Sequence, residues 1–237
     1  MRMLAIDTSN LVLSVAVVEK ARVLGELTTN LNKNHSVRLM DSISYLLQQL
    51  DMKPKELSGI AVAKGPGSYT GVRIGVATAK SMAWALGIPV VGISSLQALA
   101  SNGAGFGGGI VPLFDARRGQ VYTGLYQTGE SLLPKLAMPE RIILLRDWLP
   151  MIREQMGEQP LLFLGDDVSL HREAIVEVLG EQAVFAAPSF HLPRAAHIGW
   201  MGLAMLEKAD SPHELMPEYL QVAEAEAKWL ASQQAKQ

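Results

Sequence analysis

Small polar side chains at the ends of two predicted strands could contact a nucleotide. The first apolar run of the chain ends in Asp7, Thr8 and Ser9, and a later apolar run ends in Asp115. Two carboxylates on opposite sides of a cleft can hold Mg²⁺ through bound water. These four residues therefore form a candidate nucleotide cleft, which either works or is a vestige in which Asp7 only caps its turn.

Two further carboxylates argue against a phosphate in that cleft. Asp166 and Asp167 follow a strand expected at 161–164 and precede a helix expected at 168–179. Poorly solvated carboxylates would repel a neighbouring phosphate. We therefore predict that Asp166 or Asp167 caps the helix instead.

A glycine turn separates a predicted strand, 60–63, from a predicted helix, 71–86. The free N–H groups at such a helix N-terminus can bind an anion. Ser68 lies at this turn, but it lacks the Gly-x-Ser-x-Gly spacing of a hydrolase nucleophile and has no evident base. We predict that Ser68 caps the helix.

The residue types and spacings of metal and thiol chemistry are missing from the sequence. The chain has no Cys, which excludes disulfides, thiolate metal sites and cysteine nucleophiles. Its five His residues include no pair spaced by four residues and no His-Glu-x-x-His motif. We predict no metal site and no catalytic residue, and we reject a metalloprotease.

The composition indicates a folded protein without a strong charge bias. The 237 residues are 49% hydrophobic and 19% charged, which supports a large core and argues against wholesale disorder. A formal net charge of −2 provides no strong basic field for nucleic acid. An acid at Asp7 comes too early for a signal peptide, and no uncharged apolar run reaches the roughly 18 residues of a membrane span. We expect a soluble, cytoplasmic protein that does not bind membranes.

The predicted elements follow the order strand, strand, strand, helix, strand, helix, strand, helix, and this order then repeats. A glycine-dense stretch at 101–109 separates the two copies. Such a duplication is typical of the two-lobed actin-like or hexokinase-like ATPase (ASKHA) fold, an α/β architecture. We predict a first lobe at 1–101, a second lobe at 102–208 and a C-terminal tail, 209–237, that packs back on the body.

Two predicted helices of the first lobe are more apolar than one sheet requires. In the helix at 71–86, Gly71, Gly75 and Ala79 recur every fourth residue, and Met82 lies on the largely apolar remainder. A helix that is apolar nearly all round is buried on more than one side. Either this helix packs closely on its own sheet alone, or one of its sides meets a second protein.

The preceding helix, expected at 35–50, also has more apolar residues than one sheet requires. Its apolar arc spans about 160°, whereas covering one sheet needs roughly 100°. The two helices would together suit a four-helix bundle across an interface, unless the second lobe or the tail covers them. The predicted partner-binding residues of this helix are Leu39, Met40, Ile43, Leu46 and Leu47.

Five stretches of the chain carry a resemblance to one bacterial family. They are residues 5–9, 65–80, 88–96, 115–122 and 217–220. Taken in this order they resemble the TsaB family, also called YeaZ, while the second lobe beyond Tyr122 matches only loosely. The resemblance implies the same two-lobed fold.

The resemblance also implies a subunit without catalytic activity of its own. In that family the protein pairs with its catalytic paralogue TsaD, and with TsaE, to install threonylcarbamoyl on the adenosine beside the tRNA anticodon. It implies a heterodimer with TsaD, a homodimer in the absence of TsaD, contact with tRNA only through the complex, and no cofactor beyond weak or interfacial ATP or ADP. The paralogue's metal-binding His-x-x-x-His pair corresponds here to Ser95 and Leu99, which do not suit that metal.

A second function stays open on the residues alone, namely a stand-alone ATP-dependent phosphotransferase or ATPase of the same fold. In that protein Asp7 and Asp115 would be working residues. Arg117 and Arg118 could then contact a phosphate or tRNA, although local pairing with Asp115 is the favoured interpretation.

Overall fold

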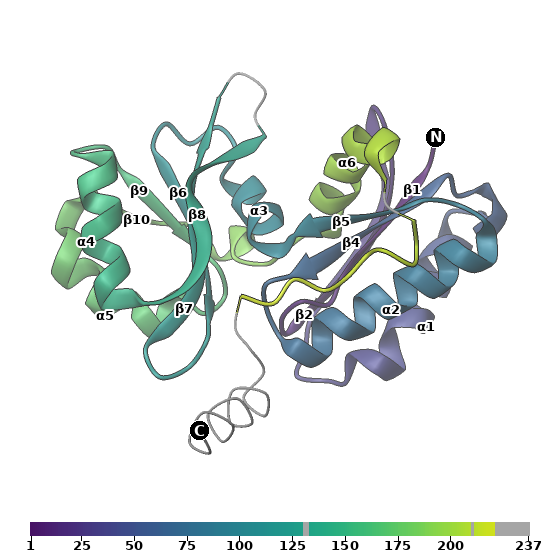
Figure 1. The fold of residues 1–237 in the computed structure, drawn as a ribbon, viewed down its shortest axis with the longest axis horizontal. Helices are drawn as coiled ribbons and strands as arrows, with labels where there is room; N and C mark the ends of the chain where they lie inside the picture. Colours follow the sequence, from purple (N-terminus) through teal and green to yellow (C-terminus); the bar gives the residue numbers. More distant parts are fainter. Residues whose placement is uncertain (130–132, 210, 221–237) are drawn as a thin grey trace, which may run out of the picture.

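Two mixed β-sheets form the centres of two lobes. The structure, a computed structural model, describes residues 1–129, 133–209 and 211–220. Over these residues the first sheet has the strand order β3-β2-β1-β4-β5 and the second has the order β10-β9-β6-β7-β8 (Figure 1). The strands of the first sheet are β1 (Met3–Asp7), β2 (Val12–Glu19), β3 (Arg22–Asn30), β4 (Gly59–Gly65) and β5 (Val90–Ser94). Those of the second are β6 (Gly109–Asp115), β7 (Gln120–Thr128), β8 (Pro134–Leu144), β9 (Leu161–Leu164) and β10 (Ala183–Phe185).

The two sheets repeat one topology. Strand β1 pairs antiparallel with β2 and parallel with β4, and β6 pairs in the same way with β7 and β9. The duplication that the element order predicts is therefore present in space as well as in sequence.

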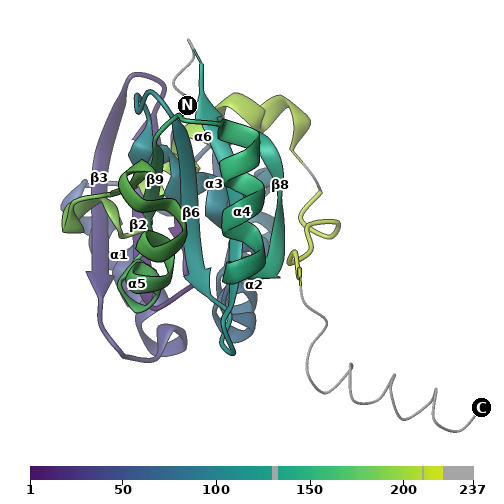
Figure 2. The ribbon, with the colours of Figure 1, turned by 90° about the vertical axis from the view of Figure 1, so that its left-hand side faces the viewer.

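Helices cover both faces of each sheet. Helices α1 and α2 lie at one end of the molecule, α4 and α5 lie at the other end, and α3 and α6 lie between the sheets (Figures 1 and 2). Their bounds are α1 (His35–Gln49), α2 (Tyr69–Leu86), α3 (Ser95–Ala100), α4 (Leu145–Met156), α5 (Val168–Leu179) and α6 (Ala195–Met205).

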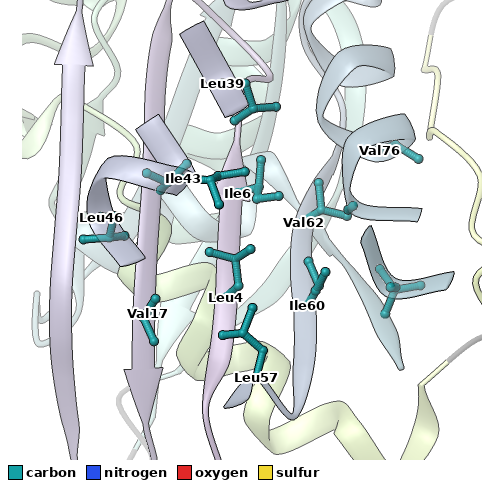
Figure 3. Packing of buried hydrophobic residues seen from close by; sticks show 14 of the residues in the cluster. Leu4, Ile6, Val17, Leu39, Ile43, Leu46, Leu57, Ile60, Val62 and Val76 are labelled. Carbon is teal, nitrogen blue, oxygen red and sulfur yellow. The ribbon is translucent and has the colours of Figure 1, made fainter. Parts of the chain in front are cut away.

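Strand β1 shows how the first sheet divides its side chains between two cores. Leu4 and Ile6 belong to the cluster beneath α1 and α2, where Figure 3 shows Ile6 beside Ile43 and Leu4 further along the strand. Met3 and Ala5 belong to the opposite cluster, which includes residues of α6. Because successive side chains of a strand point to opposite faces, the four apolar residues at the start of β1 are buried on both sides of the sheet.

Most of the predicted partner-binding residues are buried in the first of these cores. Those residues are Leu39, Ile43, Leu46, Leu47, Gly71, Gly75 and Ala79. The four leucine and isoleucine side chains are at most 5% exposed, so their assignment to a partner-binding face is wrong. Helix α1 contacts β2, β3 and α2, and its wide apolar arc is thus used within the lobe.

The small residues of α2 allow it to approach β1 closely. A Cβ atom on Gly75 would lie 2.5 Å from Thr8 Oγ1, and one on Gly71 would meet the carbonyl oxygen of Thr8. The helix packs on its own sheet along this stripe, so the partner-binding assignment of Gly71, Gly75 and Ala79 is also wrong.

The last helix of each copy packs on the sheet of the other lobe. Leu96 and Leu99 of α3 cluster with Phe114 of the second sheet, whereas Ile198 of α6 clusters with residues of the first sheet. The second lobe predicted at 102–208 therefore includes a helix, α6, that covers the first sheet instead. Element order alone does not reveal such an exchange.

Residues 211–220, here called the strap, lie along α2. The Leu215 side chain is buried in the first core. The ammonium group of Lys80 on α2 donates to the carbonyl oxygens of Leu215, at 2.8 Å, and of His213, at 3.3 Å. This part of the predicted tail packs on the body, while residues 221–237 lie outside the described part of the chain.

Candidate partner-binding face and interlobe carboxylates

Asp7, at the end of β1, is completely buried. Its Oδ1 accepts a hydrogen bond from the backbone N–H of Ser9 at 2.8 Å, and its Oδ2 has no partner. Burial raises the pKa of Asp7 to about 6, against the lowering effects of Ser9 and His35. A carboxyl group sealed in this way does not present its oxygens to the waters of a Mg²⁺ ion.

The turn after Asp7 is closed by the first turn of α2. Thr8 Oγ1 donates to the carbonyl oxygen of Gly71 at 2.8 Å, and the backbone N–H of Ser68 donates to the carbonyl oxygen of Ser9 at 2.6 Å. Ser68 Oγ in turn accepts from the Gly71 N–H at 3.2 Å, which confirms the predicted cap. Thr8 and Ser9 therefore hold the turn and the helix together.

Asp115, at the end of β6, is engaged within the second lobe. Its Oδ1 contacts His171 Nε2 at 3.1 Å, and its Oδ2 accepts from the backbone N–H of Arg117 at 3.2 Å. Local pairing of Arg117 with Asp115 is thus present, through the backbone. The Asp7 and Asp115 carboxylates therefore each form their hydrogen bonds within their own lobe.

Asp167 occupies the N-cap position of α5, but its side chain does not cap the helix. Its Oδ2 accepts instead from the backbone N–H of Asp115 at 2.9 Å. Burial raises the pKa of Asp167, and the neighbouring Asp115 and Asp166 carboxylates add to the increase. The prediction of a side-chain cap is therefore wrong, because the Asp167 carboxylate accepts its hydrogen bond from the last backbone N–H of β6 instead.

Asp166 links the two lobes. Its Oδ2 accepts a hydrogen bond from Asn30 Nδ2, at the end of β3, at 3.0 Å. The carboxylate that would face a phosphate in the predicted cleft is thus bonded across the lobes to a neutral amide.

The two positions that correspond to the paralogue's metal ligands lie on α3. Ser95 and Leu99 are fully buried, and Leu99 belongs to an apolar cluster with Phe114. Over residues 1–129, 133–209 and 211–220, no group of three or more His, Cys, Asp or Glu side chains is placed to hold a metal ion. In the same residues, no helix is both long and apolar enough to cross a membrane.

The outward side of α1 and α2 carries several accessible apolar side chains. Val37 and Met40 of α1 are 68% and 47% exposed, and Trp84 of α2 is 70% exposed. Ile74 and Met82 of α2 are partly exposed as well. Of the predicted partner-binding residues, Met40 and Met82 are thus the two that remain accessible.

A second stripe of small residues lies on this outward side. Ala77, Ser81 and Ala85 are all exposed, and their spacing of four residues puts them on one face of α2. Sequence reasoning missed these three residues, although the same spacing that reveals the inner stripe reveals this one. Together with Val37, Met40, Ile74, Met82 and Trp84 they form what we call the outer face.

A recess lies at one end of the outer face. It has a volume of about 350 Å³ and is bordered by Lys33 and His35 before and at the start of α1, and by Thr70 and Ile74 of α2. His35 Nε2 contacts the carbonyl oxygen of Asn10 at 2.7 Å. The outer face is therefore not flat where the two helices begin.

Comparison with known proteins matches the chain along nearly its full length. A family model described as TsaD, tRNA N6-adenosine threonylcarbamoyltransferase, matches residues 22–229. The tRNA threonylcarbamoyladenosine biosynthesis protein TsaB of Bacillus subtilis is 50% identical over 233 residues, which are 98% of this chain and 100% of that relative. This chain belongs to the TsaB family. The family resemblance inferred from the sequence is thus confirmed.

Solved structures agree with the TsaB assignment. YeaZ from Pseudomonas aeruginosa matches with a TM-score of 0.73 and 25% identity over 92% of this chain and 99% of that chain. The activator of the 2-hydroxyisocaproyl-CoA dehydratase from Clostridium difficile, with bound ADPNP, has a TM-score of 0.52 and 8% identity over 94% and 100% of the two chains, which shows a likeness of fold alone. The two-lobed ATPase-type fold predicted for this TsaB chain is confirmed.

Proposed function

We propose that this chain is a non-catalytic subunit of the machinery that makes threonylcarbamoyladenosine in tRNA, and that it pairs with a TsaD-type paralogue. The observation that carries the proposal is the 50% identity to the TsaB of Bacillus subtilis along almost all of both chains. The match of a TsaD family model to residues 22–229 supports a common ancestor with the proposed partner.

The outer face of α1 and α2 is the proposed contact with TsaD. Ala77, Ser81 and Ala85 leave room for a partner helix, since the distance between packed helices depends on the side chains at the contact. Met40 and Met82 beside them are adaptable apolar side chains. In the absence of TsaD, a second copy of the chain would use the same face, because a two-fold interface is self-complementary.

The surroundings of the Asp7, Asp115 and Asp166 carboxylates support a subunit without catalytic activity of its own. Asp7 is sealed in the core, Asp115 is paired with His171, and Asp166 is bonded to Asn30. We therefore propose no resident cofactor, with ATP or ADP bound weakly or at the interface with TsaD. Association with TsaE, and contact with tRNA only through the assembled complex, belong to the same proposal.

A stand-alone ATPase or phosphotransferase is the second candidate. The observation that favours it is the likeness of fold to a dehydratase activator with bound ADPNP. Titration calorimetry of the isolated chain with ATP and Mg²⁺ separates the two functions. Micromolar affinity, together with turnover that disappears in the Asp7→Ala variant, would replace the subunit assignment.

A pair of matched alanine substitutions tests the proposed interface. Ala77 on α2 and Ala174 on α5 are both exposed helical residues. Ala77→Glu places a charge on the outer face, so we expect it to abolish co-elution with TsaD and the modification activity of the reconstituted mixture. Ala174→Glu is the control and should leave both unchanged. Equal co-elution of the two variants with TsaD would show that pairing occurs elsewhere.

A further inference from the structure

The chain passes from the second lobe back to the first between β10 and α6. On the side of the second lobe, the backbone N–H of Ala186 donates to the carbonyl oxygen of Phe163 in β9 at 3.1 Å. The backbone N–H of Gly165, at the end of β9, donates to His191 Nδ1 at 3.1 Å. Residues 186–191 are therefore still bonded to the second lobe just before the chain crosses.

On the side of the first lobe, α6 is bonded to the first sheet from its first residue onward. The backbone N–H of Ala195 donates to Ser14 Oγ of β2, and that of Ala196 donates to Glu26 Oε1 of β3, each at 2.9 Å. The side chain of Arg194, at the N-cap position, does not cap the helix, so the side chains of the sheet take over this role. The crossing between the lobes is therefore confined to 192–194.

Asn102, in the turn that follows α3, binds the chain on both sides of this crossing. Its Nδ2 donates to the carbonyl oxygens of Phe190 and Leu192, each at 2.8 Å. Its Oδ1 contacts His197 Nε2, in the first turn of α6, at 3.0 Å. Helices α3 and α6 contact each other between the two sheets (Figure 1), and Asn102 lies where the end of one meets the start of the other.

The donors and acceptors of this cluster can be arranged in one way only. Carbonyl oxygens only accept hydrogen bonds, so the Asn102 NH₂ group must face Phe190 and Leu192, and Oδ1 must accept from a protonated His197 Nε2. Burial lowers the pKa of His197, and the charge of Arg194 lowers it further, against the effect of Glu26. The neutral imidazole with its proton on Nε2 fits this arrangement, and both N–H groups and the oxygen of the Asn102 amide are then hydrogen-bonded.

We propose that 192–194 is a hinge between the two lobes and that Asn102 is the lock that fixes its angle. A rotation of one lobe against the other needs changes of φ and ψ in a few residues of such a connection. Those changes would move His197 relative to the carbonyl oxygens of Phe190 and Leu192, and the Asn102 amide holds all three groups together. The hydrogen bond between Asn30 and Asp166 also joins the lobes, but it is exposed, so water can replace it. The lock does not depend on the proposed pairing with TsaD.

The absence of Cys from the chain allows a direct measurement of the angle between the lobes. Spin labels on Gln48→Cys in α1 and Glu173→Cys in α5, both exposed positions, report the distribution of distances between the lobes. We expect Asn102→Ala to broaden this distribution and to speed amide hydrogen exchange in 188–194 by roughly tenfold, because hydrogen bonds on both sides of the hinge are lost. Asn30→Ala removes an exposed asparagine bond between the lobes and is the matched control, which should leave both measurements unchanged. Equal broadening in the two variants would show that Asn102 is not the lock.

The variant His197→Phe separates the bond across the hinge from the two bonds before it. It keeps an aromatic ring in α6 and removes the donor to Asn102 Oδ1, while the bonds of Asn102 to Phe190 and Leu192 stay. We expect a broadened distance distribution together with wild-type hydrogen exchange in 188–192. A narrow distribution in this variant would overturn the action of Asn102 across the hinge, and a narrow one in a folded Asn102→Ala protein would overturn the lock itself. If Asn102→Ala does not fold, the distance distribution of His197→Phe decides alone.

Discussion

At the scale of single residues, Asp7 illustrates how a carboxylate at a catalytic-type position becomes part of a core. Its position at the end of β1 follows from the apolar run before it, and the sequence alone predicts it. Its complete burial depends on α2 lying against the Thr8–Ser9 turn, a contact between segments about 60 residues apart. The sequence therefore indicates where the carboxylate lies and leaves open whether water reaches it.

The burial of Asp7 predicts a distinct dependence of stability on pH. Its pKa is about 6 in the folded chain and 3.8 without burial, so folding favours the protonated form. The free energy of unfolding should fall as the pH rises from 3.8 to about 6, by about 3 kcal/mol in total, and then level off.

Asp7→Asn should remove this loss, because the amide is neutral at every pH and keeps an oxygen to accept from the Ser9 N–H. Urea unfolding of both proteins at pH 4 and pH 7 measures the difference. We expect the variant to gain stability relative to wild type at the higher pH. Parallel pH profiles for the two proteins would mean that Asp7 is solvated.

At the scale of elements, α2 carries two stripes of small residues with opposite roles. Gly71, Gly75 and Ala79 lie against β1, while Ala77, Ser81 and Ala85 are exposed. Periodicity identifies both stripes but does not show which one faces the sheet. Small side chains suit a close contact with the chain's own sheet and with a partner equally well. The wide apolar arc of α1 led to the wrong prediction of a partner-binding face for a related reason. The helix packs on two strands and on α2 within its own lobe, and these contacts use the whole arc.

The two stripes should respond differently to the same substitution. Gly75→Leu forces a side chain against Thr8 and should destabilise the fold by about 1–3 kcal/mol, as overpacked cores do. Ala77→Leu, two residues away and exposed, should change stability by less than about 0.5 kcal/mol. Thermal unfolding of both variants is the measurement. A Gly75→Leu protein as stable as wild type would show that the inner stripe is not tightly packed.

At the scale of the whole molecule, the duplicated topology could be predicted from the sequence, and the exchange of α3 and α6 could not. Element order and the glycine-rich 101–109 segment indicate two copies of one unit. The apolar residues of α6 would suit either sheet, however, and only the packing of Gly199 and Gly202 against Val18, Ala5 and Ala61 selects the first.

This exchange predicts that the first lobe is not an independent folding unit. A fragment ending at residue 101 retains its sheet sequence but lacks α6, so Met3, Ala5, Val18 and Ala61 lose their cover. We expect such a fragment to show no cooperative unfolding transition, and the intact chain to show a single one. Calorimetry of both is the check, and a sharp transition of the fragment would contradict the prediction.

The long separation in sequence between β1 and α6 also has a consequence for synthesis on the ribosome. The first strand emerges from the exit tunnel long before the helix that shields its second face, because nearly 200 residues separate Met3 from α6. During that interval the nascent protein presents an uncovered apolar surface. Chaperones that hold partly made chains should therefore bind this surface until α6 has left the exit tunnel.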